Sequence, residues 1–328
     1  MRKIPIKVMR KWKDIFNRFS RKYLLGKFDF WERLGIHITP VSYYSPIPNM
    51  EDLKKKIDLW EKPETMAGFD WNENDQIKIM REVFPLYAQE CSLFPQTEKD
   101  RTNIFDYYIQ NPSFPMGDTC ILYSLVRHFK PKKIIEIGSG FSTLVIARAA
   151  TFVTPTPELI SINPFPGQFE DLFCKGFPGF TRLEKTPVED IPLEYFDQLQ
   201  ENDILFIDSS HVIKLMADVL FLYLKVIPNL KPGVIIHAHD IFLPYHMPKE
   251  FVFEKHWFWN EQYLLQAFLA FNKEFEILFS AQYMKKYRDE LQSIFPGYWA
   301  GGSFWFRRKK MHNLSADYPN EIKENRVS

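Results

Sequence analysis

The sequence predicts an α/β protein with a doubly wound, mostly parallel sheet of seven strands, helices on both faces and an antiparallel hairpin at one edge. Two observations lead to this fold class. Between residues 118 and 308, short apolar segments alternate with segments of helical periodicity, which is the pattern of strands joined by crossover helices. The first apolar segment ends in two closely spaced glycines, and a helical segment follows them directly. Such a turn brings a free helix N-terminus to the edge of the sheet, where ligands bind.

The predicted elements follow in chain order. Asp118 is predicted as the N-cap of a helix over residues 119–129, because its carboxylate can accept hydrogen bonds from free backbone N–H groups. No helix is expected at 283–302, between the last two strands, so these strands are predicted to form the antiparallel hairpin. The other connections are expected to be right-handed crossovers. Strands are expected at 133–137, 159–162, 180–183, 204–207, 233–237, 275–279 and 303–307, and further helices at 141–149, 212–226 and 260–272.

The chain divides into four predicted parts: a basic amphipathic helix (1–27), an N-terminal cap or extension (28–117), the α/β domain (118–308) and a polar tail expected to be disordered (309–328). The first part carries ten basic residues and one acid, which leaves 32 basic and 40 acidic residues in the rest of the chain. Its apolar stripe fits three interpretations: a helix on an anionic membrane, a helix docked on the protein itself, and a transit peptide.

Composition limits the class of protein. The three cysteines, Cys91, Cys120 and Cys174, are far apart and have neither the spacing of a zinc site nor the number of a disulfide scaffold. No run of 18 apolar residues occurs, and no apolar segment follows the basic start, so neither a spanning helix nor a secretory signal is expected. The acidic body argues against nucleic acid as a partner. We therefore expect a cytoplasmic protein, with residues 1–27 as the candidate for peripheral contact with the inner membrane face.

The glycine turn indicates the kind of ligand. It reads Glu136-Ile137-Gly138-Ser139-Gly140 and continues into the helix through Phe141-Ser142-Thr143. Two glycines let the backbone turn sharply beside a ligand. A dinucleotide site would have a third glycine at position 143, where helix and strand pack around a pyrophosphate. The turn therefore suits a nucleoside without a pyrophosphate better than NAD, and its alternative interpretation is a tight turn with no ligand.

The segment EIGSGFST (136–143) resembles motif I of the class I S-adenosylmethionine-dependent methyltransferases. The resemblance extends through FIDSSHV (206–212), HAHDIFLP (237–244), WNEQYLLQAFL (259–269) and GGSFW (301–305). This set is similar to a bacterial branch related to the catechol O-methyltransferase-like and cephalosporin-hydroxylase-like groups. The resemblance implies an enzyme that transfers methyl from S-adenosylmethionine to a hydroxyl of a small molecule or glycan.

The same resemblance implies the cofactor site. The motif places the methionine part of the cofactor at the turn, and the residues implied there are Glu136, Gly138, Ser139, Gly140, Ser142 and Thr143. Where the family has an acid that accepts both ribose hydroxyls, this chain has Asn163, whose amide has one acceptor oxygen. We therefore expect a weaker ribose contact. Asp190 and its neighbour Glu189 are the candidates beside the adenine, with a helix cap as their alternative role.

Ionisable side chains follow two further strands. Asp208 ends the fourth predicted strand, and His239 and Asp240 follow the fifth. In the usual strand order 3-2-1-4-5 these ends are neighbours of the glycine turn, and His211 lies one short turn beyond Asp208. A histidine here could act as the base that deprotonates a hydroxyl, or a divalent metal could do so. Resemblance to the catechol-type enzymes implies Asp208 and Asp240 as ligands of Mg²⁺, whereas His237 is expected to be a core residue inside the strand.

The acceptor region and one competing function complete the predictions. The loop 240–259 is rich in proline and aromatic residues, and its Tyr245, Trp257 and Trp259 are candidates to stack on an acceptor or to pack on the N-terminal extension. The competing function is a catalytically weak or inactive cofactor-binding adaptor that associates with a membrane or a partner, suggested by Asn163 and the basic first segment. The ionisable cluster favours the enzyme, since an adaptor does not need it.

Overall fold

The structure is a computed structural model and describes residues 24–310. It separates the chain into two compact units, 1–59 and 60–328. The helix predicted for the first 27 residues and the polar tail lie almost entirely outside the described part. The boundary predicted at 117/118 does not coincide with the boundary between the compact units.

The first unit contains short helices only. Its described elements are a 3₁₀ turn at Leu25–Lys27, α2 (Phe28–Arg33), α3 (Met50–Lys54) and a second 3₁₀ turn at Ile57–Leu59. Asn49 caps α3 by accepting a hydrogen bond from the backbone N–H of Glu51 at 2.9 Å. None of these helices buries a side chain.

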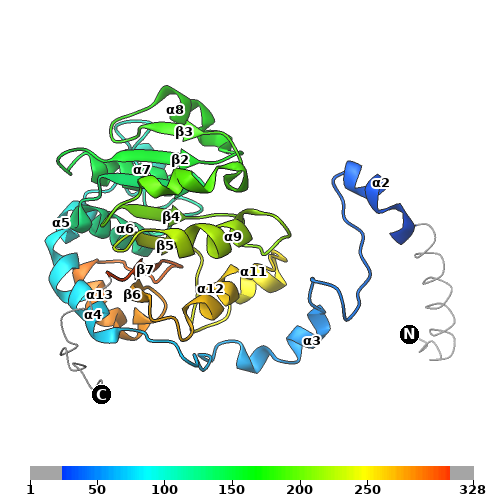
Figure 1. Cartoon of the computed structure of the whole chain (residues 1–328). Coiled ribbons are helices and arrows are strands. Elements are labelled where there is room, and N and C mark those ends of the chain that lie inside the picture. Colours follow the sequence, from blue (N-terminus) through cyan, green and yellow to red (C-terminus); the bar gives the residue numbers. More distant parts are fainter. Residues whose placement is uncertain (1–23, 311–328) are drawn as a thin grey trace, which may run out of the picture. The chain divides into compact units, whose positions relative to one another are not determined.

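The second unit is built on one sheet of seven strands in the order β3-β2-β1-β4-β5-β7-β6 (Figure 1). Only β7 is antiparallel, to β5 on one side and to β6 on the other. The predicted fold class and strand order are confirmed, and the edge hairpin is present with its second strand inserted next to β5. The strands are β1 (Lys133–Ile137), β2 (Glu158–Ile162), β3 (Arg182–Glu184), β4 (Ile204–Ile207), β5 (Ile235–Ala238), β6 (Phe275–Ser280) and β7 (Phe304–Arg308).

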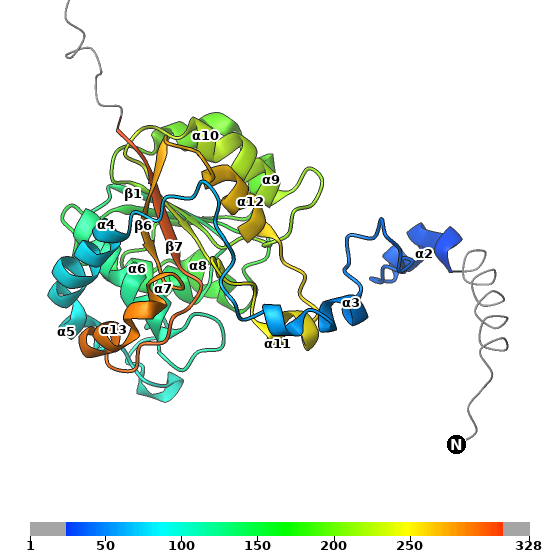
Figure 2. The same ribbon diagram turned by 90° about the horizontal axis from the view of Figure 1, so that it is seen from below.

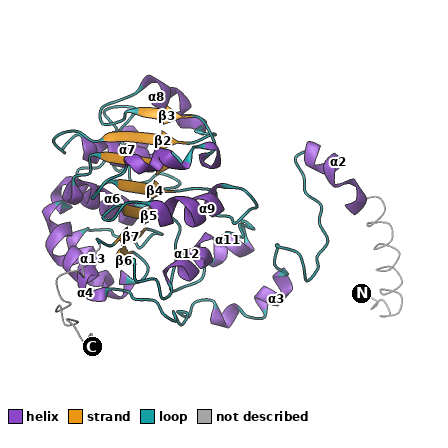
Figure 3. Ribbon diagram, viewed as in Figure 1, coloured by secondary structure: helices purple, strands orange, loops and turns teal. Residues whose placement is uncertain are grey.

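Helices cover both faces of the sheet (Figure 3). Successive strand residues point to opposite faces, so Ile134 and Ile204 enter one hydrophobic core while Ile135 and Leu205 enter the other. The first core includes α6 (Met116–Phe129) and α7 (Phe141–Ala150), and the second includes the helical stretch 218–229 and α12 (Glu261–Leu269). The stretch 218–229 consists of α9 (Asp218–Phe221), a π-helical turn at Leu222–Val226 and α10 (Ile227–Asn229). Shorter helices are α8 (Glu170–Lys175) and α11 (Lys249–Phe253).

Residues between Trp60 and the sheet add a helical layer. They form α4 (Glu73–Lys78), a π-helical turn at Ile79–Val83, a 3₁₀ turn at Phe84–Leu86 and α5 (Ala88–Cys91). Buried Met80, Phe84 and Phe114 from this segment belong to the same core as α6 and α7. This layer is therefore part of the compact unit that holds the sheet.

Two helix predictions were wrong. The helix predicted at 212–226 begins only at Asp218, because Asp218 accepts hydrogen bonds from the backbone N–H and hydroxyl of Ser210 at 2.7 and 2.8 Å. Residues 283–302 hold a 3₁₀ turn at Met284–Tyr287 and α13 (Arg288–Ile294), where no helix was expected. These short helices are fixed by burial of Leu291 and Phe295 in the core, which local sequence does not reveal.

Asp118 is not a helix cap. The helix α6 begins at Met116 after Pro115, and Asp118 lies inside its first turn with its side chain fully buried. Its carboxylate accepts hydrogen bonds from the backbone N–H groups of Gly302 at 3.1 Å and Ser303 at 3.0 Å. Asp118 therefore joins the start of α6 to the start of β7. Among the described helices, none combines the length and apolar character needed to cross a bilayer.

Candidate active site

The glycine turn after β1 is locked against the end of β4. Gly138 has φ +84°, and a Cβ built on it would lie 2.0 Å from the backbone carbonyl oxygen of Asp208. Gly140, in contrast, has open space around the corresponding position. Position 138 thus requires glycine for the packing of the two strand ends, whereas position 140 leaves room beside the turn.

The side chain of Glu136 holds this turn in place through hydrogen bonds from the core side. Its buried carboxylate accepts hydrogen bonds from the hydroxyls of Ser142 and Thr143, both at 2.8 Å, and from Ser161 on β2. Thr143 in turn accepts a hydrogen bond from the backbone N–H of Gly140 at 3.0 Å. Burial raises the pKa of Glu136 to about 7, and the three hydroxyl donors oppose this rise. Glu136, Ser142 and Thr143 therefore fix the shape of the turn from the core side.

A cavity of about 430 Å³ lies at the carboxyl ends of β1, β2 and β4. Ser139, Asn163 and Asp208 line it, together with Glu189. Asp190, the sequence-predicted residue beside the adenine, is exposed and does not line the cavity; its neighbour Glu189 does. The volume falls within the usual range for small-molecule sites.

Asn163 uses both ends of its amide within the protein. Its Nδ2 donates to the Ser139 hydroxyl at 2.9 Å, and its Oδ1 accepts from the backbone N–H of Phe165 at 2.8 Å. The side chain therefore ties the end of β2 to the glycine turn. Its one acceptor oxygen already has a donor, which strengthens the expectation of a limited contact with a ribose.

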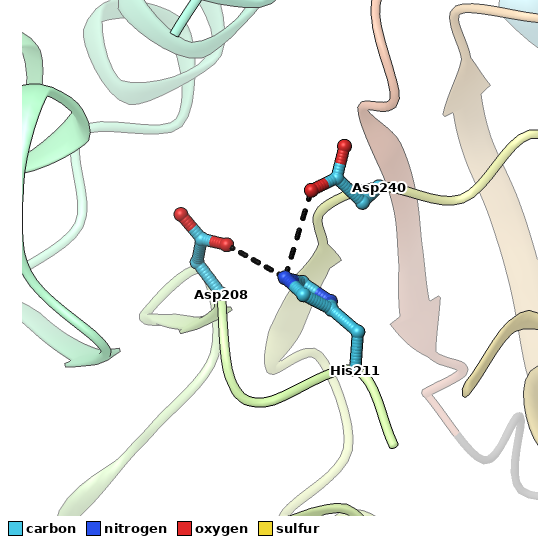
Figure 4. Close-up of side chains that lie close together, drawn as sticks. All are labelled: Asp208, His211 and Asp240. Carbon is cyan, nitrogen blue, oxygen red and sulfur yellow. Dashed lines mark ion pairs between the residues drawn. The ribbon is translucent and has the colours of Figure 1, made fainter. Parts of the chain in front are cut away.

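His211 is oriented by a buried acid. Its Nδ1 lies 2.9 Å from a carboxylate oxygen of Glu261, and the other oxygen of Glu261 accepts from the Tyr223 hydroxyl at 2.9 Å. Its Nε2 lies 3.2 Å from Asp208 Oδ1 and 3.6 Å from Asp240 Oδ2, so it points between the two aspartates (Figure 4). A histidine held in this way at one nitrogen presents the other in a fixed direction.

His239 repeats this arrangement from the other side. Its Nε2 lies 3.2 Å from Asp118 Oδ2, and its Nδ1 lies 3.7 Å from Asp208 Oδ1 and 3.5 Å from Asp240 Oδ2. The Nδ1 atom is buried and has no hydrogen-bond partner. Two imidazoles, each positioned by a buried carboxylate, therefore face the same pair of aspartates.

The backbone at this cluster is unusual. His211 has φ +58° and Asp240 has φ +54°, both in the left-handed region that most side chains avoid. Local strain of this kind persists where the surrounding structure enforces it, and it concentrates at functional sites. In this conformation His211 points toward Asp208 and Asp240, and the Asp240 carboxylate faces His211 and His239.

The charges of the cluster favour a positive group at its centre. Four carboxylates, those of Asp118, Asp208, Asp240 and Glu261, surround two imidazoles. Burial acts to lower the pKa of His211, but Asp208 and Glu261 raise it to about 10. The pKa of His239 is raised well above its usual value by Asp240 and Asp208, against the effect of burial. Burial acts to raise the pKa of Asp208, but His239 and His211 lower it to about 2.

The sequence predicts that the residues at the centre of this cluster lie close together, but it does not predict the two acids that orient the histidines. Asp118 is predicted as a helix cap, and Glu261 falls in the first turn of the helix predicted at 260–272. Both acids are almost fully buried. A carboxylate on the apolar side of a predicted helix is the signal that could have identified them. His237 is a core residue as expected, 3.1 Å from the Ser303 hydroxyl through its Nε2 and stacked on Phe206.

The aromatic residues of the loop after β5 have different positions. The ring of Trp259 lies 4.6 Å from that of His211, and Trp257 stacks on Trp259 at 4.7 Å. Tyr245 instead lines a second cavity beyond the loop. Trp259 therefore packs against the cluster, while Tyr245 is free to contact a ligand.

Comparison with known proteins finds similarity in the central part of the chain. Residues 135–241 match the model of a family described as a methyltransferase domain. An uncharacterised protein of Archaeoglobus fulgidus is 29% identical over 177 residues, which cover 52% of this chain and 77% of that protein. The segment that matches the family model begins in β1 and ends just after Asp240. It therefore contains the glycine turn and both Asp208 and Asp240.

Two solved structures show a partial likeness to this chain. The O-methyltransferase TomG of Streptomyces achromogenes is 15% identical with a TM-score of 0.40, over 73% of this chain and 97% of that chain. The methyltransferase PaMTH1 of Podospora anserina is 16% identical with a TM-score of 0.41, over 81% and 99%.

The match to a methyltransferase domain therefore lies in the part of the sheet that holds β1, β2, β4 and β5, whose order is that of a doubly wound α/β fold.

Proposed function

We propose that the protein is an S-adenosylmethionine-dependent methyltransferase that methylates a hydroxyl group of a small-molecule acceptor, a class that includes glycans, with Asp208, His211, His239 and Asp240 as the catalytic cluster. One observation carries the proposal: Asp208 lines the cavity beside the glycine turn and also contacts His211 at 3.2 Å. A single side chain thus joins the space suited to the methyl donor and the group of ionisable residues. This junction is where the acceptor oxygen would meet the methyl group.

The cavity supplies the groups for binding S-adenosylmethionine. Ser139 and Asn163 lie at its wall near the turn, and Glu189 lies where an acid can accept hydrogen bonds from the nucleoside. Glu136, Ser142 and Thr143 contribute by holding the turn in shape. Gly140 leaves space beside the turn for the methionine part.

The chemistry needs an oxygen nucleophile. The acceptor oxygen forms a bond to the methyl carbon while the carbon–sulfur bond breaks, and the sulfur keeps the electron pair. The hydroxyl proton must pass to a basic group. His239 is the candidate in its neutral form, because Asp118 holds the ring in direction through Nε2 and leaves Nδ1 without a hydrogen-bond partner. The aspartates favour the charged imidazole, and a cation bound between Asp208 and Asp240 would favour the neutral form that can accept the proton.

The cluster also fits a divalent cation. Asp208, His211 and Asp240 each offer one ligand atom, and these atoms lie within 4.8 Å of one another. The Glu261 contact leaves Nε2 of His211 directed toward the aspartates, as in sites where a second carboxylate orients a histidine ligand. A bound cation would lower the pKa of the acceptor hydroxyl and orient it. Carboxylates suit Mg²⁺, and the added imidazole suits Mn²⁺ and other transition metals.

The proposal is tested by assay and by binding. Purified enzyme should bind S-adenosylmethionine and S-adenosylhomocysteine in calorimetric titration, and should not bind NAD. Transfer of a labelled methyl group to a panel of sugars and phenols should then yield an ether-linked product. Label found only on nitrogen or sulfur acceptors would refute O-methylation, while absence of cofactor binding would refute the placement of the cavity.

Chelation is expected to stop methyl transfer. EDTA followed by desalting should remove the cation held by Asp208, His211 and Asp240, and added Mn²⁺ should restore transfer at a lower concentration than Mg²⁺ because one ligand is a nitrogen. Rates are measured against cation concentration in the metal-depleted enzyme. Full activity after chelation, with no metal left in elemental analysis, would show that the cluster works without a cation.

Asn163→Asp is expected to preserve or tighten binding of S-adenosylmethionine. The carboxylate offers more acceptor positions to a ribose, the Phe165 N–H keeps its partner, and the Ser139 hydroxyl can turn to donate. Calorimetry compares the variant with the wild type and with Asn229→Asp, an exposed control. A tenfold or larger loss of affinity in a folded variant would show that the amide itself contacts the cofactor.

A further inference from the structure

A second cavity, of about 730 Å³, lies between the loop after β5 and the segment that joins β6 to β7. Tyr245 and Lys249 line it from the first side, and Lys285, Arg288 and Trp299 from the second. We call this cavity the acceptor groove. Figure 2 shows α11 and α13, the helices that carry Lys249 and Arg288, in the lower part of the view.

The groove adjoins the catalytic cluster through two short connections. Phe242, in its wall, is two residues beyond Asp240. Ala300, also in its wall, leads through Gly301 to Gly302, whose carbonyl accepts a hydrogen bond from the Ile241 N–H at 2.9 Å. A Cβ built on Gly302 would lie 2.6 Å from the Cα of Asp240. Short backbone segments therefore connect the wall of the groove to Asp240 of the cluster.

Some basic side chains of the groove have an acidic partner and others do not. Lys249 pairs with Glu61 at 2.6 Å, and Glu250 pairs with Lys255 at 2.9 Å. Lys285 and Arg288 form no ion pair with any other residue in the described part of the chain. Both acids of the wall thus have partners of their own, and two cations remain available.

These two cations are placed over aromatic rings. The Nζ of Lys285 lies 5.5 Å from the centre of the Tyr245 ring, and the Cζ of Arg288 lies 5.1 Å from the centre of the Trp299 ring. Such contacts hold a cation while leaving its hydrogen-bond donors free. Trp299 is 62% exposed, so its ring offers an open flat surface beside the charge. An acidic ring compound could use both the ring surface and the donors.

We propose that the acceptor groove selects a hydroxylated ring compound that carries a carboxylate. Lys285 and Arg288 bind the carboxylate, and the Trp299 and Tyr245 rings contact the ring that bears the hydroxyl. This inference rests on the proposed O-methyltransferase function and specifies its acceptor. A sugar acid and an aromatic acid present the same chemistry to the groove.

Matched pairs of probes test the proposal. Glucuronate and glucose differ in one carboxylate, and so do 3,4-dihydroxybenzoate and catechol. Binding of each probe is measured by calorimetry with S-adenosylhomocysteine present, and methyl transfer is measured separately. We expect at least one acid to bind about tenfold or more tightly than its neutral partner, equivalent to about 1.4 kcal/mol. The pair that shows this preference tells whether the acceptor is a sugar acid or an aromatic acid.

Two double variants test whether Lys285 and Arg288 cause the preference for the acid. Lys285→Gln combined with Arg288→Gln should remove the preference for the acid and leave the affinity for S-adenosylhomocysteine unchanged. The charge-matched control, Lys99→Gln with Lys175→Gln, alters two exposed lysines that do not line the groove and should keep the preference.

Two outcomes would overturn the proposal: no acid binds better than its neutral partner at millimolar concentration, or the groove variant keeps the full preference. Because these are binding measurements, they are independent of catalysis. An enzyme that binds the acid but transfers no methyl group to any hydroxyl would contradict the proposed function and leave the groove assignment standing.

Discussion

Asp240→Asn is expected to lower methyl transfer about a hundredfold or more, a rise of about 2.7 kcal/mol in the activation barrier. Asp240 Oδ2 lies 3.6 Å from His211 Nε2 and 3.5 Å from His239 Nδ1, so the substitution removes a charge from the centre of the cluster. Asparagine tolerates the φ of +54° found at this position, so the fold should be kept. Asp240 does not line the cofactor cavity, and the affinity for S-adenosylmethionine should change little.

Two comparisons make the result specific. Asp75→Asn, on the exposed side of α4, removes a carboxylate paired only with Lys78 and should leave transfer unchanged. Asp208→Asn should lower both transfer and cofactor affinity, because Asp208 belongs to the cavity and to the cluster. Labelled-methyl assays and calorimetry measure the two quantities. If Asp240→Asn retains full transfer, the cluster has no part in the reaction.

Gly138→Ala is expected to destabilise the protein by at least about 2 kcal/mol and to abolish cofactor binding. The new Cβ would lie 2.0 Å from the carbonyl oxygen of Asp208, and the φ of +84° is strained for alanine. The turn after β1 must then move away from the end of β4. Urea denaturation measures the change in the free energy of unfolding, and calorimetry measures the loss of binding.

Gly140→Ala tests the contact between the turn and the cofactor without disturbing the packing of the turn. Its Cβ would have no heavy atom within 4 Å, and its φ of 178° is extended, so the variant should unfold near the urea midpoint of the wild type. Cofactor affinity should nevertheless fall, because the methyl group enters the space beside the turn. Equal stability of the two alanine variants would disprove the packing assigned to Gly138.

Most of the strands were predictable because they are short buried apolar segments, as is typical of parallel strands covered on both faces. Ile204–Ile207 and Lys133–Ile137 show this directly, and the glycine turn marked the sheet edge where the cofactor cavity lies. The exception among the strands is β3, whose sequence Arg-Leu-Glu is only partly buried. The centre of the cluster was predictable because parallel strands bring their carboxyl ends together. Asp208 and Asp240 were therefore placed together from strand positions alone.

What could not be predicted depends on contacts between distant parts of the chain. Asp118 has the local signature of a cap, but its carboxylate binds backbone N–H groups of residues 302 and 303. Glu261 orients a histidine fifty residues before it, and no spacing rule links the two. The position of Glu189, rather than Asp190, at the cavity wall depends on which way a short 3₁₀ turn presents its side chains.

The insertion of β7 between β5 and β6 has a consequence for how the protein is made. As the chain emerges from the ribosome, β5 has no partner on its outer side until Phe304–Arg308 has been synthesised. An unpaired strand edge is open to pairing with other chains, so the nascent domain is exposed to aggregation until that point. The residues just before β7 also supply the backbone donors that hold Asp118. The contacts that hold Asp118 beside His239 therefore form only after residues 302 and 303 have been synthesised, so the ionisable cluster is among the last parts of the fold to be completed.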